Sequence, residues 1–170
     1  IGNYELSGCR ITSSKPMHVL SFAGETDVVL NNRQRTLAEH NVHMIRLKDD
    51  LSHVFEVYSA LQRGEMVSMP GDRIFGSDKT VTVSLFGREA HLPVGPFQTG
   101  VTMNVRMLTV WVMKERWNTY RIYVRELEQH PHLSRQQHIA DLAQQFASQL
   151  ENMARLYPDQ WYHYYDFFAK

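Results

Sequence analysis

The first five residues carry the clearest chemical pattern in the chain. Residues 1–5 read IGNYE, so a histidine just before Ile1 would complete the spacing His-x-x-x-x-Glu, with Glu5 as its acid. A neutral imidazole can take a proton from a hydroxyl near pH 7. A nearby carboxylate fixes the tautomer of the imidazole and stabilises the imidazolium that forms. The spacing therefore indicates base-catalysed activation of a hydroxyl, with Glu5 as a catalytic residue. The alternative is that Glu5 is an N-terminal surface acid.

The two residues before Tyr4 form the second part of this candidate site. Attack on a thioester carbonyl generates an oxyanion, which needs hydrogen-bond donors. We expect Asn3 and Gly2 to shape the turn that leads to Glu5, and Asn3 to contribute to substrate binding. The alternative interpretation is that both residues serve only to form a turn and the start of a helix.

A third group of candidate residues follows a short predicted strand. Asp72 and Arg73 come after residues 66–69 and a Pro-Gly turn, and ligand sites of open α/β sheets lie at such strand ends. A guanidinium can hold a phosphate through two hydrogen bonds. We therefore expect Arg73 to bind a phosphate of the substrate and Asp72 to orient Arg73 or a sugar hydroxyl. Lys79 is a further phosphate-binding candidate, and the alternative is a local Asp–Arg surface pair.

The bulk composition narrows the class of protein. The 170 residues have 18 basic and 18 acidic side chains, so the chain lacks the excess positive charge that is typical of a nucleic-acid-binding protein. No apolar run approaches the roughly 20 residues that span a bilayer. The histidines show no convincing metal-ligand spacing, so we expect no metal site. Residues 71–76 are not a G-x-G-x-x-G loop, which argues against a nucleotide-binding protein.

Strand patterns and helix patterns alternate along the chain. Apolar or alternating runs predict strands at residues 17–23, 42–47, 66–69, 80–86, 107–113 and 120–124. Helical spacing predicts helices near residues 51–61, 97–104 and 134–157, the last beginning at a capping box of Ser134 and Gln137. The pattern is typical of an α/β fold. We expect a central mixed sheet flanked by helices, with a long C-terminal helix, in one domain over residues 1–170.

Four segments in order resemble one family of enzymes. Residues 1–5 resemble the end of the catalytic motif of the bacterial lipid A biosynthesis (lauroyl/myristoyl) acyltransferases, of the lysophospholipid acyltransferase-like superfamily. Residues 63–72, RGEMVSMPGD, resemble a second block in which Gly-Glu leads through a strand to an aspartate. Residues 86–87 with 92–96 resemble a Phe-Gly turn followed by a helix start. Residues 157–162, YPDQWY, resemble the closing block. The family often has Gln where Arg73 stands.

The resemblance implies a fold, an activity and a location. It implies a glycerolipid-acyltransferase-like fold and transfer of a fatty acyl chain from acyl carrier protein or coenzyme A thioester to a hydroxyl of a lipid A precursor. It implies a His/Glu dyad, no metal or redox cofactor, and work at the cytoplasmic face of the bacterial inner membrane.

Several alternatives stay open beside this interpretation. The acceptor could be a lysophospholipid, an aminolipid or another glycolipid, or the chain could be a lipid-binding module that keeps the fold without catalysis. The resemblance also implies that an N-terminal anchor, the start of the domain and the catalytic histidine precede Ile1. We expect the 170 residues alone to transfer no acyl groups. The aromatic side chains after residue 160 could serve core packing or an interfacial belt; we favour packing for Trp161.

Overall fold

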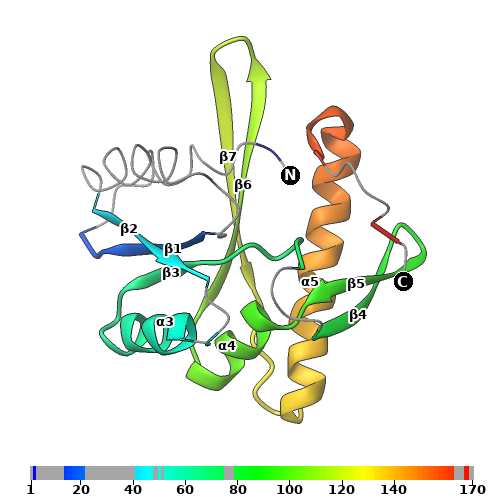
Figure 1. The fold of residues 1–170 in the computed structure, drawn as a ribbon. Coiled ribbons are helices and arrows are strands. Elements are labelled where there is room, and N and C mark those ends of the chain that lie inside the picture. Colours follow the sequence, from blue (N-terminus) through cyan, green and yellow to red (C-terminus); the bar gives the residue numbers. More distant parts are fainter. Residues whose placement is uncertain are drawn as a thin grey trace. The chain divides into compact units, whose positions relative to one another are not determined.

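The fold is α/β, as the sequence predicts, and its strands form small sheets (Figure 1). It is seen in a computed structural model, which describes residues 2, 14–21, 41–47, 50, 52–74, 79–162 and 167–168. The chain divides into two compact units. Unit 1 comprises residues 1–7, 71–74 and 78–170, and unit 2 comprises residues 8–70 and 75–77. Assignment of the whole chain to one domain stays a prediction.

Unit 2 contains a parallel sheet and one helix. Its strands are β1 (Met17–Ser21), β2 (Val42–Arg46) and β3 (Met66–Ser68), in the order β2-β1-β3. Helix α3 (Ser52–Gln62) connects β2 to β3. Gly64 ends the helix with φ +73°, and the next amide, that of Glu65, donates to the carbonyl of Ala60. A glycine with positive φ is a common way to end a helix.

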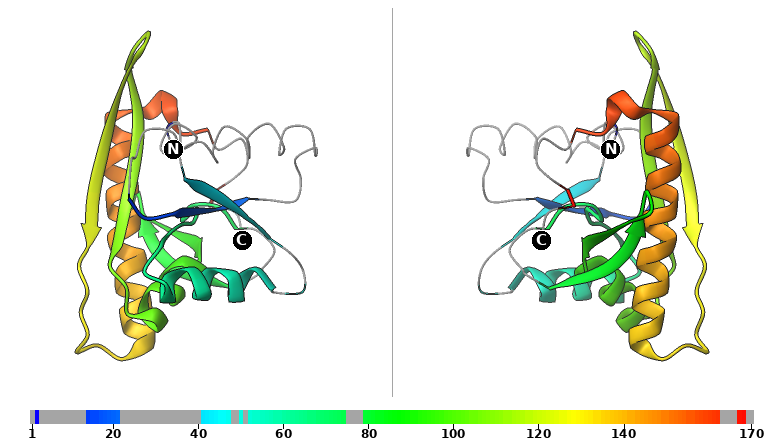
Figure 2. Two further views of the ribbon diagram at one scale, coloured as in Figure 1. Left: turned by 90° about the vertical axis from the view of Figure 1, so that its left-hand side faces the viewer. Right: turned by 90° about the vertical axis from the view of Figure 1, so that its right-hand side faces the viewer.

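Two antiparallel hairpins and two helices make up the described part of unit 1. The hairpins are β4 (Thr80–Leu85) with β5 (Arg88–Pro93) and β6 (Met107–Arg116) with β7 (Thr119–Leu127). Helix α4 (Gly95–Met103) lies between the hairpins in sequence, with Pro96 in its first turn. Helix α5 (Arg135–Leu156) is followed by the short 3₁₀ helix η1 (Pro158–Gln160). Figures 1 and 2 show α5 running alongside the β6–β7 hairpin.

The core of unit 1 forms where α5 packs on both hairpins. Leu142 and Leu150 of α5 are fully buried, and Met153 continues the same stripe. The hairpins contribute Leu85, Leu92, Trp111, Met113 and Leu127. The predicted apolar stripe of this helix and its capping box at Ser134 are both confirmed.

Three glutamine side chains attach helical segments to strands in the same way. Gln144 of α5 accepts from the amide of Ser84 (2.8 Å) and donates to the carbonyl of Ser84 (3.0 Å). Gln145 pairs likewise with the backbone of Glu128, and Gln160 of η1 with that of Lys114. Each amide side chain thus satisfies the donor and the acceptor of one residue, which lies in a strand for Gln144 and Gln160 and directly after β7 for Gln145.

Strand β5 corrects the sequence prediction, which assigns no strand to residues 88–93 and treats residues 92–96 as the start of a helix. Leu92 and Pro93 instead end β5, which pairs with β4 from Leu85↔Arg88 to Thr80↔Pro93. The connecting turn is Phe86-Gly87, and both residues have positive φ (+53° and +72°). A two-residue turn of this type matches the twist of a hairpin, so the chain reverses directly into a second strand.

Candidate active site

The start of the predicted catalytic motif is held tightly where the structure describes it. Asn3 and Glu5 lie outside the described residues, but Gly2 lies inside them and is buried. Its amide donates to the backbone carbonyl of Gln160 (2.8 Å). Gly2 has φ +69°, and a Cβ there would collide with the carbonyl of Val112 and approach Sδ of Met113 to 2.8 Å. Only glycine fits this close approach of the motif to β6.

The loop that carries Asp72 and Arg73 rests on an aromatic cluster. Residues 71–74 belong to unit 1, and both candidate side chains are half-buried. A Cβ at Gly71 would lie 2.7 Å from Cζ of Phe146, so the loop backbone packs directly on this ring of α5. The Phe146 ring in turn contacts Trp111 (centroids 5.4 Å apart). The core of the unit thus supports the predicted substrate loop.

Lys79 occupies a separate place, one residue before β4. Its side chain is exposed, and its carbonyl accepts a hydrogen bond from the amide of Val94 (3.2 Å). The structure therefore places Asp72 and Arg73 on one loop and Lys79 at the start of β4. The substrate-binding roles of these residues and of Asn3 stay predictions, as does catalysis by Glu5.

A histidine–carboxylate pair that sequence analysis does not identify lies in unit 2. His18 Nε2 of β1 lies 2.8 Å from Oε2 of Glu65, the residue before β3. Arg63 donates to both oxygens of the same carboxylate, at 2.9 and 2.7 Å. Hydrogen bonding to Arg63 is the largest cause that lowers the pKa of Glu65 to about 2, and the bond to His18 adds to it. Because 47 residues separate His18 from Glu65, no local spacing signals the pair.

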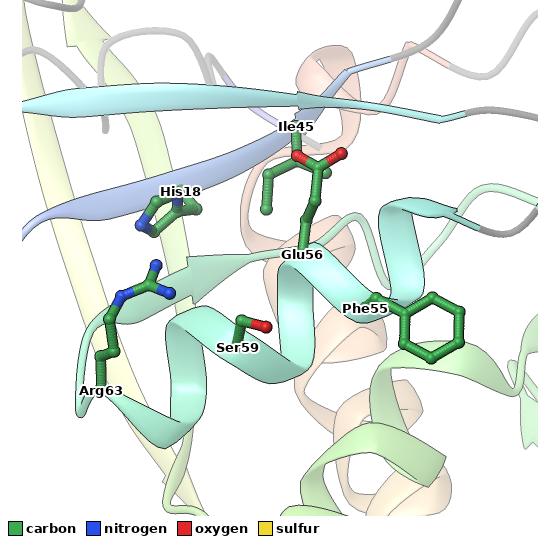
Figure 3. A pocket seen from close by; sticks show the side chains of 6 residues that line it. All are labelled: His18, Ile45, Phe55, Glu56, Ser59 and Arg63. Carbon is green, nitrogen blue, oxygen red and sulfur yellow. The ribbon is translucent and has the colours of Figure 1, made fainter.

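His18 of this pair lines an open pocket of about 290 Å³ between α3 and the parallel sheet (Figure 3). The side chains that line the pocket are those of His18, Ile45, Phe55, Glu56, Ser59 and Arg63. A catalytic base needs a carboxylate that stabilises its imidazolium, but the Glu65 oxygen nearest His18 also accepts from Arg63. We therefore interpret the side chains of His18, Arg63 and Glu65 as a structural network that joins β1 to the start of β3.

A second histidine–carboxylate pair joins the segment after β7 to α5. His130 Nδ1 lies 2.8 Å from Oδ2 of Asp141, which also accepts from Gln145 (2.8 Å). The amide of His130 donates to Nε2 of His138 (3.2 Å). Within the described ranges no three His, Cys, Asp or Glu side chains group as ligands for a metal ion. These contacts hold the turn at residues 130–133 against the helix.

The aromatic segment after η1 packs on the core where it is described. Trp161 contacts Phe86 (centroids 5.8 Å apart) and Phe167 (5.2 Å), and all three rings lie against the core cluster. The prediction of packing for Trp161 is confirmed. Tyr162 is about half exposed, and residues 164 and 165 lie outside the described residues.

A model of one protein family covers almost the whole chain. The sequence model of the family described as bacterial lipid A biosynthesis acyltransferase matches residues 1–167. The chain therefore belongs to this acyltransferase family, which confirms the resemblance seen in the sequence. A search among curated proteins found no match.

Proposed function

We propose that the protein transfers a fatty acyl chain from acyl carrier protein or coenzyme A thioester to a hydroxyl of a lipid A precursor. The family match over residues 1–167 carries this proposal. The hydroxyl attacks the thioester carbonyl, the new ester bond forms, and the thiol leaves with a proton. In this proposal a histidine encoded directly before Ile1 takes the hydroxyl proton, and Glu5 stabilises the resulting imidazolium.

Substrate binding is proposed for the loop after β3 and its neighbours. Arg73 would hold a phosphate of the donor or the acceptor, and Asp72 would orient Arg73 or a sugar hydroxyl. The packing of Gly71 on Phe146 supports this role because it gives the loop a rigid base. Lys79 is the second cation proposed for phosphate, and Asn3 is proposed to shape the turn at the reacting group.

The proposal also places the protein on the cytoplasmic face of the bacterial inner membrane. Among the residues described, no helix has the length and apolar character needed to cross a bilayer. The β6–β7 turn supports contact with a membrane surface, because Trp117 is 89% exposed there and Tyr120 is exposed beside Lys114 and Arg116. Aromatic side chains next to cations favour the interface of an anionic bilayer.

The test is the steady-state rate of acyl transfer by variants of the complete gene product. Because general-base catalysis contributes on the order of 10²–10⁴-fold, Glu5→Ala should lower kcat by roughly 100-fold or more with little change in KM. Arg73→Lys should mainly raise KM, since lysine cannot form the two-pronged contact. Glu128→Gln, at an 83% exposed carboxylate, is the control and should keep the wild-type rate.

Two results would reject the proposed dyad. A wild-type rate for Glu5→Ala removes the carboxylate from the mechanism. A codon other than histidine before Ile1 removes the base, and the lipid-binding module without catalysis then becomes the better interpretation.

A further inference from the structure

The segment after α5 has no assigned chemistry, yet it lies at a junction of three parts of unit 1. Residues 158–161 read PDQW, and η1 covers the first three of them. Pro158 stands in the first turn of η1, where its fixed φ suits a helical start. The amide of Gln160 donates to the carbonyl of Tyr157 (3.1 Å), which closes the turn on the end of α5.

The side chain of Gln160 joins this turn to β6. The amide of Lys114 donates to Oε1 of Gln160, and Nε2 of Gln160 donates to the carbonyl of Lys114, each at 2.8 Å. Both hydrogen bonds are short and involve a single strand residue. The pair therefore fixes the position and the orientation of Gln160 relative to β6.

The backbone carbonyl of Gln160 accepts the third hydrogen bond, from the amide of Gly2 (2.8 Å). Gly2 is confined on its other side by β6, where Val112 and Met113 leave no room for a Cβ. The backbone of residue 2 is thus clamped between β6 and η1. Gln160 contributes to both sides of this clamp, because its side chain holds the strand and its carbonyl holds Gly2.

The end of α5 is itself fixed to the β6–β7 hairpin. The hydroxyl of Tyr157 donates to Oε1 of Glu115 (2.5 Å) and lies 2.7 Å from the hydroxyl of Tyr123. The bond to Glu115 is the largest cause that raises the pKa of Tyr157 above its usual value. The residue that precedes η1 is therefore anchored, and η1 is a rigid support for whatever it holds.

We propose that Gln160 is a positioning residue for the catalytic motif at residues 1–5. This inference rests on the proposed function, in which Glu5 and a histidine before Ile1 are the catalytic pair. Gly2 lies between these two positions, three residues before Glu5. Loss of the Gln160 clamp lets the connecting segment move, and a displacement of about 1 Å in a catalytic geometry costs on the order of 100-fold in rate.

The experiment compares Gln160→Ala with Gln144→Ala. Gln144 makes the same pair of hydrogen bonds to one strand residue, Ser84, at 2.8 and 3.0 Å, so both variants lose similar contacts. We expect Gln160→Ala to lower kcat about tenfold or more, with KM within about twofold of wild type. Gln144→Ala should lower the melting temperature to a similar extent and keep kcat within about twofold.

The pH dependence gives a readout that a purely structural role would not change. A nearby carboxylate raises the pKa of an imidazole, so loosening the dyad should move the acidic limb of the kcat/KM profile to lower pH. We expect this shift in Gln160→Ala alone. Equal effects of the two variants on kcat and on the acidic limb, or a wild-type kcat in Gln160→Ala, would overturn the inference.

Hydrogen exchange separates failure of this inference from failure of the proposed function. If the wild-type protein transfers no acyl group, the proposed function fails and kinetics cannot judge the clamp. The exchange rate of the Gly2 amide then decides, because Gln160→Ala should raise it roughly tenfold while Gln144→Ala leaves it unchanged. An unchanged rate in Gln160→Ala would show that Gln160 does not hold the motif.

Discussion

Replacement of Gly71 by alanine tests whether the loop with Asp72 and Arg73 really rests on Phe146. Gly71 does not lie in the left-handed region, so the alanine meets a steric obstacle and no backbone strain. Its Cβ would lie 2.7 Å from Cζ and 2.8 Å from Cε2 of Phe146. The ring cannot easily retreat, because it contacts Phe97 (centroids 5.8 Å apart) and Trp111 (5.4 Å).

The expected loss in the free energy of unfolding follows from the addition of a methyl group to a packed site. Overpacking costs about 1–3 kcal/mol in most cores, and a domain of this size loses roughly 2–4 °C in Tm for each kcal/mol. Gly71→Ala should therefore lower Tm by about 4–8 °C for a cost near 2 kcal/mol. Thermal unfolding followed by circular dichroism measures this shift.

Two controls make the result specific to the contact. Gly95→Ala adds the same methyl group where no atom lies within 4 Å, so its stability should stay within about 0.5 kcal/mol of wild type. In Phe146→Leu the smaller side chain should reduce the cost of Gly71→Ala, which a double-mutant cycle detects. A wild-type Tm for Gly71→Ala, or strictly additive effects in the cycle, would show that the Phe146 ring does not restrict the space at Gly71.

Two further predictions concern the charged network of unit 2 and the start of α5. Because the pKa of Glu65 is lowered from 4.5 to about 2, its ion pair stabilises the fold above pH 4.5 and this stabilisation is lost as the pH falls toward 2. In Glu65→Gln, the free energy of unfolding should therefore fall less steeply between pH 4.5 and pH 2 than in the wild type, as measured by urea unfolding at each pH. An unchanged dependence on pH would show that the Glu65 ion pair does not stabilise the fold. Ser134→Ala removes the side chain that accepts a hydrogen bond from the amide of Gln137 at the start of α5. Urea unfolding should show a free energy of unfolding lower by about 1 kcal/mol. Ser134→Asp should retain most of the stability, and equal losses in both variants would exclude the cap as the cause.

The elements predicted correctly are those whose signals are local in sequence. Helix α5 shows its capping box at Ser134 and an apolar stripe through Leu142 and Leu150, and both act within a few residues. The β6–β7 hairpin combines a continuous apolar strand with a turn near Asn118. Such features depend little on distant parts of the chain, so the sequence alone is enough to place them.

The missed strand β5 shows where local signals mislead. Its turn places Phe86 at φ +53°, where asparagine or aspartate beside glycine would be expected. Long-range contacts compensate for this conformation: the Phe86 ring contacts Trp161, and its amide donates to Glu151 (2.6 Å). Because both partners lie in the C-terminal segment, the sequence near residue 86 does not reveal the hairpin.

The candidate site also combines features that the local sequence predicts with long-range contacts that it does not. The loop with Asp72 and Arg73 follows from the strand and the Pro-Gly turn before it, but its support by Phe146 is a contact over 75 positions of sequence. The pairing of His18 with Glu65 depends on the parallel register Met17↔Met66. Neither contact has a spacing that sequence reasoning could recognise.

Mass spectrometry of the product would show whether the protein transfers an acyl chain to a lipid hydroxyl. The complete gene product would be incubated with a lipid A precursor and a fatty acyl thioester, first of acyl carrier protein and then of coenzyme A. Acyl transfer to a hydroxyl predicts a product heavier than the precursor by one fatty acid less one water. Mild alkali should cleave the new ester, and Glu5→Ala should form the product roughly 100-fold more slowly. An unmodified precursor beside an intact thioester, with the wild-type protein folded and at high concentration, would contradict acyl transfer to this lipid.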